Sequence, residues 1–190
     1  MKYTDEQLIK RVETNAKDFT GWKKGVYDIW VRSAADVMDS FDDKVYTFEV
    51  EKDGAMPQFR MVCSGTSHAG SYGLKKFKNY NPAGCAVLES DRIVYGSHVL
   101  GKHKGYVAYK QVKGFPYYRD SDRDDKAEEI GAVHNDVIAA NCHRASEKGD
   151  SKVIYNWSVA CLVRNRINQW KAWLAFMAGR PLNVVILKEF

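Results

Sequence analysis

One histidine and one cysteine near the end of the chain have the residue types of a nucleophilic pair. His143 and Cys161 lie in the segment NCHRASEKGDSKVIYNWSVACLVRN, residues 141–165. A catalytic thiol needs a base, donors for the developing oxyanion and a lowered pKa. His143 would be the base, and the backbone N–H groups of Ala160 and Cys161 would be the donors. A protonated His143 and the start of the following helix would favour the thiolate.

Four residues around this pair are predicted to bind substrate: Asn141, Arg144, Trp157 and Arg164. Asn141 would share one strand face with His143, because alternate residues of a strand point to the same side, and Cys142 would then face the core. The arginines could grip substrate carboxylates in a bidentate way. The alternatives stay open: solvated surface charges for the arginines, and core packing for Trp157.

The spacing around the pair resembles a known motif. His143, fourteen intervening residues and then Ser158-Val159-Ala160-Cys161 resemble the His…Ser/Thr-His-Gly-Cys motif of the YkuD-type L,D-transpeptidase catalytic domain. The likeness is greater to a phage- and bacteroidete-encoded variant group. The stretches that carry it include VRSAADVMDSFDDKVYTFEV, GCAVLESDRIVYGSHVLGKHKG and FPYYRDSDRD, so that it covers residues 26–187.

The resemblance implies a mostly β, sandwich-like catalytic domain whose cysteine forms a thioester with a peptidoglycan stem peptide. On matching positions, Cys161 would be the nucleophile, His143 the base, and Ser158 a neighbour that helps to fix their geometry. Attack of an amine on the thioester would make the enzyme a transpeptidase, and attack of water would make it a hydrolase. No cofactor and no metal are implied.

The chain departs from the motif at two positions, where Val159 replaces the second His and Ala160 replaces Gly. Alanine restricts the backbone of the turn relative to glycine. The departures motivate an alternative, a non-catalytic cell-wall-binding or phage structural module with the same fold. The chemical rival is a zinc-dependent hydrolase with His134, His143 and Cys161 as ligands.

The elements that must position these residues are mostly short strands. Two-residue alternation predicts strands at 26–31, 46–50, 58–63, 86–88, 92–95, 106–112, 115–118, 137–143, 153–155 and 182–187. A capping box at Thr4 and Gln7 predicts a helix near the N-terminus, and apolar residues from Ile167 to Met177 predict a second one. The expected fold is α+β and mostly β. It has an N-terminal helical segment, residues 1–25, and one strand-rich catalytic domain, residues 26–190.

Composition limits the other possibilities. The chain has 190 residues and a net charge of +5, from 29 basic and 24 acidic residues, with no dense basic stripe. Nucleic acid is therefore not an expected partner. Four cysteines without a CxxC pair predict free thiols. The residues Asp120, Asp122 and Asp124 fit either a loose calcium-binding turn or a solvated acidic loop.

The sequence also gives an expectation for location. No run reaches the ~20 apolar residues that cross a bilayer, and the first fifteen residues lack the apolar stretch of a secretory signal. We therefore expect synthesis in the cytoplasm without membrane association, and action at the bacterial cell wall or periplasm if the protein is phage-released. The sequence leaves the oligomeric state open.

Overall fold

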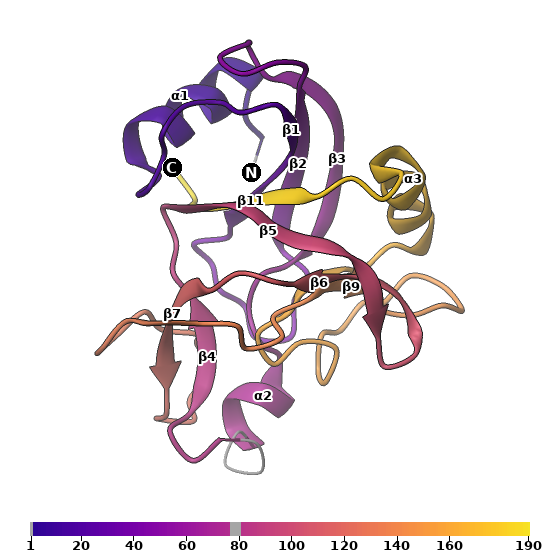
Figure 1. The fold of residues 1–190 in the computed structure, drawn as a ribbon. Coiled ribbons are helices and arrows are strands. Elements are labelled where there is room, and N and C mark those ends of the chain that lie inside the picture. Colours follow the sequence, from indigo (N-terminus) through magenta and orange to yellow (C-terminus); the bar gives the residue numbers. More distant parts are fainter. Residues whose placement is uncertain (1, 77–80) are drawn as a thin grey trace.

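Eight strands close into a barrel, and three more form a small sheet below it in Figure 1. The computed structural model describes residues 2–76 and 81–190. In spatial order the barrel strands are β1 (Gly25–Arg32), β11 (Leu182–Lys188), β5 (Arg92–His103), β6 (Tyr106–Gln111), β9 (Cys142–Arg144), β10 (Leu162–Arg164), β3 (Gln58–Thr66) and β2 (Asp43–Val50). The small sheet has the order β4 (Cys85–Leu88), β7 (Phe115–Asp120) and β8 (His134–Asp136).

In the described parts of the chain, three helices lie around these strands: α1 (Asp5–Asn15), α2 (Ser71–Lys76) and α3 (Ile167–Met177). The predicted capping box starts α1, since the Thr4 hydroxyl accepts a hydrogen bond from the Gln7 N–H and the Gln7 side chain accepts one from the Thr4 N–H. Figure 1 shows α1 at the top of the barrel, α3 at its right-hand side and α2 beside the small sheet. The two ends of the chain meet near α1, where Tyr3 stacks on Phe190.

The prediction of one mostly β unit with a helix near each end is confirmed. The strands, however, form a closed barrel and not the two-sheet sandwich that the resemblance implied. Closure depends on the three-residue strand β10, which pairs in parallel with β9 and antiparallel with β3. It therefore joins the last part of the chain to the first hairpin and completes the ring.

The β5–β6 hairpin is longer than predicted and carries chemistry at its tip. The sequence predicted a strand over 92–95, whereas β5 continues to His103. Lys104 and Gly105 form the turn with φ of 46° and 89°, the pair of positive values that matches the twist of a tight hairpin. The register then places His103 directly opposite Tyr106.

Two predicted strands are wrong. Residues 137–141 are irregular, because the left-handed backbone of Ala139 (φ 60°) breaks the extended run, and only β9 forms beyond them. Residues 153–155 form a turn in which Tyr155 also has positive φ (45°). Both segments instead become loops, and loops are where functional side chains are commonly placed.

The core has two main parts, divided by the barrel wall. Along β1, Val26 and Trp30 belong to the interior cluster, to which barrel strands and α3 contribute. The alternate residues Tyr27, Ile29 and Val31 pack outward against α1. This is the two-residue alternation of a strand that is covered on both faces.

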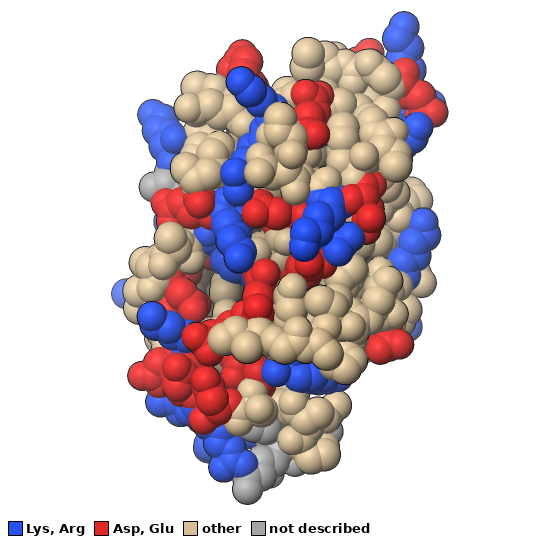
Figure 2. Space-filling view, turned by 90° about the vertical axis from the view of Figure 1, so that its left-hand side faces the viewer, with Lys and Arg blue, Asp and Glu red and all other residues tan. Residues whose placement is uncertain are grey.

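Basic and acidic side chains are interspersed on the face shown in Figure 2, with acidic groups gathered in its lower half. Ion pairs join charged groups in and just after α1 to groups just before β5, among them Arg11 with Asp91 and Lys17 with Glu89. Among the described residues, no helix combines the length and the apolar character that spanning a bilayer requires.

A candidate cysteine–histidine active site

The side chains of Cys161, His143 and His103 lie close together at the barrel wall. The Cys161 sulfur and one ring nitrogen of each histidine all lie within 4.8 Å of one another. His143 comes from β9, Cys161 immediately precedes β10, and the two strands are paired in parallel. The structure therefore brings the predicted pair together, but among the described residues no hydrogen bond joins them, and the thiol instead lies 3.6 Å from the Ala139 carbonyl oxygen. Such looseness is common in a site without substrate.

The hydrogen bonds of His143 fix its tautomer. Its Nδ1 lies 2.7 Å from the Arg144 carbonyl oxygen and 3.1 Å from the Tyr106 hydroxyl. A carbonyl can only accept, so Nδ1 carries the proton and Nε2 holds the lone pair. Nε2 is buried and has no hydrogen-bond partner among the described residues. The ring is thus held in the form that can take a proton from a thiol.

The pKa values correct the expected resting state. Burial lowers the pKa of His143 to about 3, against the raising effect of its bond to Arg144. Burial also raises the pKa of the Cys161 thiol to about 11, although the backbone of Asn141 and the charge of Lys104 oppose this. Near neutral pH the pair is therefore a neutral thiol and a neutral imidazole. The expected thiolate is disfavoured mainly because the thiol is buried, and neither an imidazolium at His143 nor the start of α3, which lies at Ile167, offsets that burial.

The turn before Cys161 is fixed by backbone contacts. The Ser158 hydroxyl donates to the Cys161 carbonyl at 2.8 Å, and the Ser158 carbonyl accepts from the Gly70 N–H at 3.0 Å. Ser158 thus holds the turn, as expected. Within the described ranges, no acceptor is found for the N–H groups of Ala160 and Cys161, so both are free to bind an oxyanion. Ala160 has no positive φ, which explains why alanine is accommodated where the motif has glycine.

Cys161 opens onto a pocket of about 630 Å³ between the barrel and the small sheet. Tyr72, Tyr155 and Trp157 are aromatic members of its lining, and Lys104 and Arg119 are the basic ones. No aspartate or glutamate lines the pocket in the part of the chain that the structure describes. Cys161 is a partly exposed residue and belongs to the pocket lining, and the surrounding charge favours an anionic ligand.

The prediction that Arg164 binds substrate is wrong. Its side chain is fully buried in the barrel interior, where Nη2 lies 2.6 Å from a carboxylate oxygen of Asp28. Nη1 contacts the Cys142 sulfur at 3.0 Å, and the guanidinium stacks on Trp173. The residue faces inward because strand alternation in β10 turns it to the core. Cys142 faces the same interior, as predicted.

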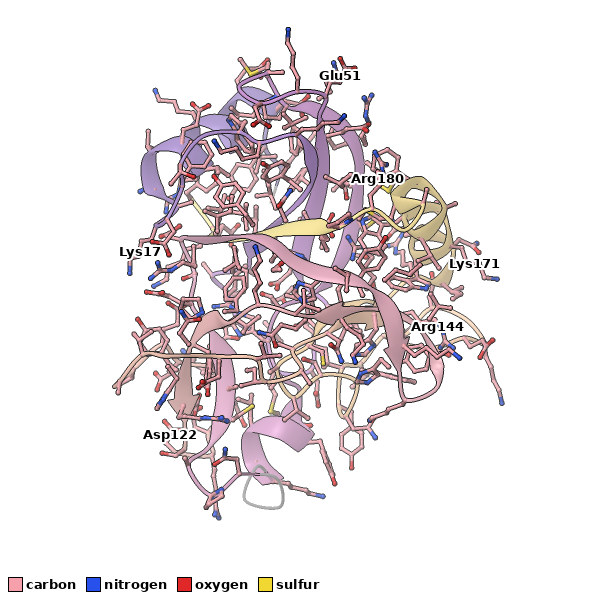
Figure 3. The ribbon with its side chains drawn as sticks, viewed as in Figure 1. Lys17, Glu51, Asp122, Arg144, Lys171 and Arg180 are labelled. Atoms are coloured by element: carbon pink, nitrogen blue, oxygen red, sulfur yellow. The ribbon has the colours of Figure 1, made fainter. Side chains whose placement is uncertain are left out.

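The remaining predicted residues have different positions. Trp157 lines the pocket, and its contact with substrate stays a prediction. The Arg144 guanidinium lies over Tyr106 and pairs with Glu147 beside the β5–β6 hairpin (Figure 3), so the part of Arg144 that reaches His143 is its carbonyl. Asn141 is buried and acts as a bridge, since its oxygen accepts from the Gln111 N–H and its nitrogen contacts Nδ1 of His103.

His103 is the residue that sequence reasoning missed. Its ring stacks on His143 with 4.3 Å between centroids and 8° between planes. His134, the histidine of the predicted zinc set, instead lies on β8 against Tyr117, outside the group. The one available signal was the Lys104–Gly105 turn, which marks a hairpin but does not reveal what its tip contacts.

The acidic loop after β7 lies elsewhere. Asp122 and Arg144 are on opposite sides of the molecule in Figure 3. Asp120, Asp122 and Asp124 each accept a hydrogen bond from a backbone N–H further along the loop. Among the described residues, the only group arranged to hold a metal ion is His103, His143 and Cys161. The three aspartates therefore act as turn-forming residues.

Comparison with known proteins gives no relative: no family model, no curated protein and no solved structure matches the chain.

Proposed function

We propose that the protein is a cysteine-dependent acyl-transfer enzyme that acts on peptidoglycan stem peptides, of the L,D-transpeptidase or L,D-peptidase kind. One observation carries the proposal. The Cys161 thiol lines a pocket beside an imidazole whose proton-bearing nitrogen is engaged and whose basic nitrogen has no hydrogen-bond partner among the described residues. This is the arrangement of a nucleophile, its base and an orienting group.

The reaction begins when Nε2 of His143 takes the thiol proton and the Cys161 sulfur attacks a peptide carbonyl carbon. The carbonyl oxygen becomes an oxyanion, and the free N–H groups of Ala160 and Cys161 stabilise it. The peptide C–N bond then breaks, and the departing amine takes the proton from His143, which leaves a thioester. Water or a second amine next attacks the thioester, the C–S bond breaks, and the sulfur recovers its proton.

The neutral resting pair has a consequence for this mechanism. Because the thiol pKa is raised and the imidazole pKa is lowered, charge separation is unfavourable until substrate is present. Proton transfer and attack on the carbonyl are then expected to occur together, with the Arg144 carbonyl stabilising the imidazolium as it forms. Such an enzyme keeps its thiol protected from adventitious electrophiles.

The pocket supports an anionic peptide as substrate. Lys104 and Arg119 provide positive charge without a lining carboxylate to oppose it, and the aromatic walls would pack against the peptide backbone. Stem peptides carry free carboxylates, which fits this lining. The resemblance of the His143–Cys161 segment to the L,D-transpeptidase motif supports the same class.

Incubation with a carbapenem followed by intact-mass measurement tests the proposal, because the β-lactam C–N bond opens as a thioester forms on the nucleophile. We expect one adduct, lost in Cys161→Ser. Cys85→Ser is the matched control, because Cys85 lines the same pocket but is buried and its thiol bonds to the Val159 carbonyl. Failure of the folded wild-type protein to form an adduct at Cys161 would refute the proposal.

A zinc hydrolase is the second candidate, because His103, His143 and Cys161 are close enough to surround an ion after small movements. It predicts about one zinc per chain in elemental analysis, and loss of muropeptide release from isolated sacculi upon chelation. A cysteine acyl-transferase keeps its activity in chelator. The two candidates therefore give opposite results in one assay.

A further inference from the structure

We propose that His103 is a further catalytic residue, a neutral imidazole that donates its Nε2–H to the oxyanion formed at Cys161, and that Asn141 is its positioning residue. The inference rests on the proposed acyl transfer and names a group that the His143–Cys161 motif does not contain. Three independent features of the site carry it: the tautomer of His103, its stacking on His143 and its place in the pocket wall.

The tautomer follows from a chain of hydrogen bonds. The Gln111 backbone N–H can only donate, so the Asn141 atom that it contacts at 3.0 Å is the amide oxygen. The amide nitrogen must then be the atom 3.1 Å from His103 Nδ1. An amide nitrogen can only donate, so Nδ1 of His103 accepts. The proton of the neutral ring is therefore on Nε2.

His103 and His143 are thus held in opposite tautomers. In His143, Nδ1–H donates a hydrogen bond to the Arg144 carbonyl oxygen, and Nε2 is the free base. In His103, Nδ1 accepts a hydrogen bond from the Asn141 amide nitrogen. Nε2–H is then the free donor, with no hydrogen-bond partner among the described residues. One ring can accept the proton of the thiol while the other donates to the oxygen on which negative charge develops.

The stacked geometry keeps His103 neutral and close. The rings are nearly parallel at 4.3 Å, so a positive charge that forms on His143 during the reaction opposes protonation of His103. The exposed cation Lys104, next in the chain, acts in the same direction. His103 also lines the pocket with Cys161, which gives its donor access to a bound carbonyl oxygen.

The same hydrogen bonds argue against zinc. Ligation through His103 Nε2 would require the other tautomer, in which two N–H groups, those of Asn141 and Nδ1, would face each other. Ligation through Nδ1 would remove the bond to Asn141. Rotation of the Asn141 amide would not help, because its oxygen would leave the Gln111 N–H without an acceptor. Nε2 of His103 therefore carries a proton, so it can donate a hydrogen bond but cannot ligate zinc.

Two reactions of Cys161 test the proposal, because only one of them forms an oxyanion. Carbapenem acylation passes through a tetrahedral oxyanion, whereas iodoacetamide alkylation displaces iodide at a saturated carbon. His103→Phe keeps a stacked ring and removes the donor, and we expect acylation to slow by about 10²–10³-fold, as for loss of one oxyanion donor. Alkylation should change less than about threefold, because the base His143 and the thiol are unaltered.

His103→Gln restores an N–H donor and should recover at least about tenfold of the acylation rate lost in His103→Phe. Asn141→Leu should slow acylation and leave alkylation unchanged, since without the Asn141 donor either ring nitrogen of His103 can carry the proton. His134→Phe is the matched control, because His134 also stacks on an aromatic ring, that of Tyr117, but lies outside the site, and both of its rates should equal those of the wild type.

The outcomes separate cleanly. Equal slowing of both reactions in His103→Phe would mean that His103 acts on the thiol or on the fold, and it would overturn the inference. An unchanged acylation rate would overturn it as well, while acylation of the wild type would leave the proposed function intact. Absence of wild-type acylation would instead refute the proposed function, and the inference with it.

Discussion

Cys142 and Cys161 each lie beside a nitrogen-bearing side chain, and they differ in burial, in the kind of nitrogen group nearby and in access to a pocket. Cys142 is fully buried in the barrel interior, 3.0 Å from the guanidinium of Arg164. Cys161 is partly exposed on a pocket near two imidazoles. Cys142 begins β9 in register with Leu162, and Cys161 lies one position before Leu162 on the neighbouring strand. Neighbouring positions of one strand pair therefore hold a thiol of the barrel interior and a thiol that lines the pocket.

The comparison shows that nearness to a nitrogen does not activate a thiol. Arg164 is a donor that stays protonated: burial opposes its charge, but Asp28 raises its pKa above the ordinary value. It cannot take a proton from Cys142, whose pKa burial raises to about 12. His143 offers a lone pair, and the pocket offers access. A base that can accept, and a path for substrate, distinguish the two sites.

The largest expected difference is in alkylation. We expect iodoacetamide to modify Cys161 at least about 10³-fold faster than Cys142, because a fully buried thiol reacts only when the structure opens, at a cost of about 5–15 kcal/mol for global opening. Peptide mapping after timed quenching measures both rates. Cys161→Ser should lose the fast site and Cys142→Ser should keep it. Modification of both thiols at one rate would contradict the comparison.

The interior cluster should instead govern stability. Arg164→Met leaves the Asp28 carboxylate buried and uncompensated, and we expect a loss of about 3–5 kcal/mol in the free energy of unfolding, measured in urea. The double variant Asp28→Asn, Arg164→Met should lose less than the sum of its parts. Arg60→Met is the control, since its ion pair with Glu49 is at the surface and contributes at most about 1 kcal/mol. Equal losses of stability in Arg164→Met and Arg60→Met would contradict the greater importance of the buried ion pair.

The pocket site should show a characteristic pH dependence. The folded pKa of Cys161 is about 11, so its thiolate fraction rises with pH, about tenfold for each unit between pH ~7 and ~10. His143, with a pKa of about 3, stays neutral throughout this window and adds no inflection. The alkylation rate of Cys161 should follow the thiolate fraction. A plateau from neutral pH upward would indicate a preformed thiolate–imidazolium pair and would contradict the neutral resting state.

The smallest effect concerns the C-terminus of α3, beside the interior cluster. Ala178 caps the helix in the left-handed conformation (φ 46°, ψ 36°), which glycine adopts without strain. Ala178→Gly should raise the free energy of unfolding by about 1 kcal/mol and leave the alkylation rate of Cys161 unchanged. Ala172→Gly, at an exposed position inside the same helix, should lower it by about as much. If both substitutions changed the free energy of unfolding in the same direction, the left-handed conformation of Ala178 would not explain the effect of Ala178→Gly.

The nearness of His143 to Cys161 could be predicted because both residues lie in one short segment. The types of His143 and Cys161, and the apolar residues around them, are local properties of the sequence. Mostly β architecture follows in the same way from two-residue alternation, and the N-terminal helix from its capping box. Each of these depends on residues that are close along the chain, so no long-range contact was needed to infer them.

Only the tertiary structure decided which other side chains join the pair. His103 is forty positions before His143, and it reaches the site because a two-residue turn extends the β5–β6 hairpin to it. Arg164 was expected at the surface and lies in the interior, because closure of the barrel determines which face of β10 is buried. The sequence determines which residues carry chemistry. The closure of the barrel determines which of these residues point into the interior and which point into the pocket. The reason is that side-chain direction in a three-residue strand is set by the neighbouring strands and not by the strand's own sequence pattern.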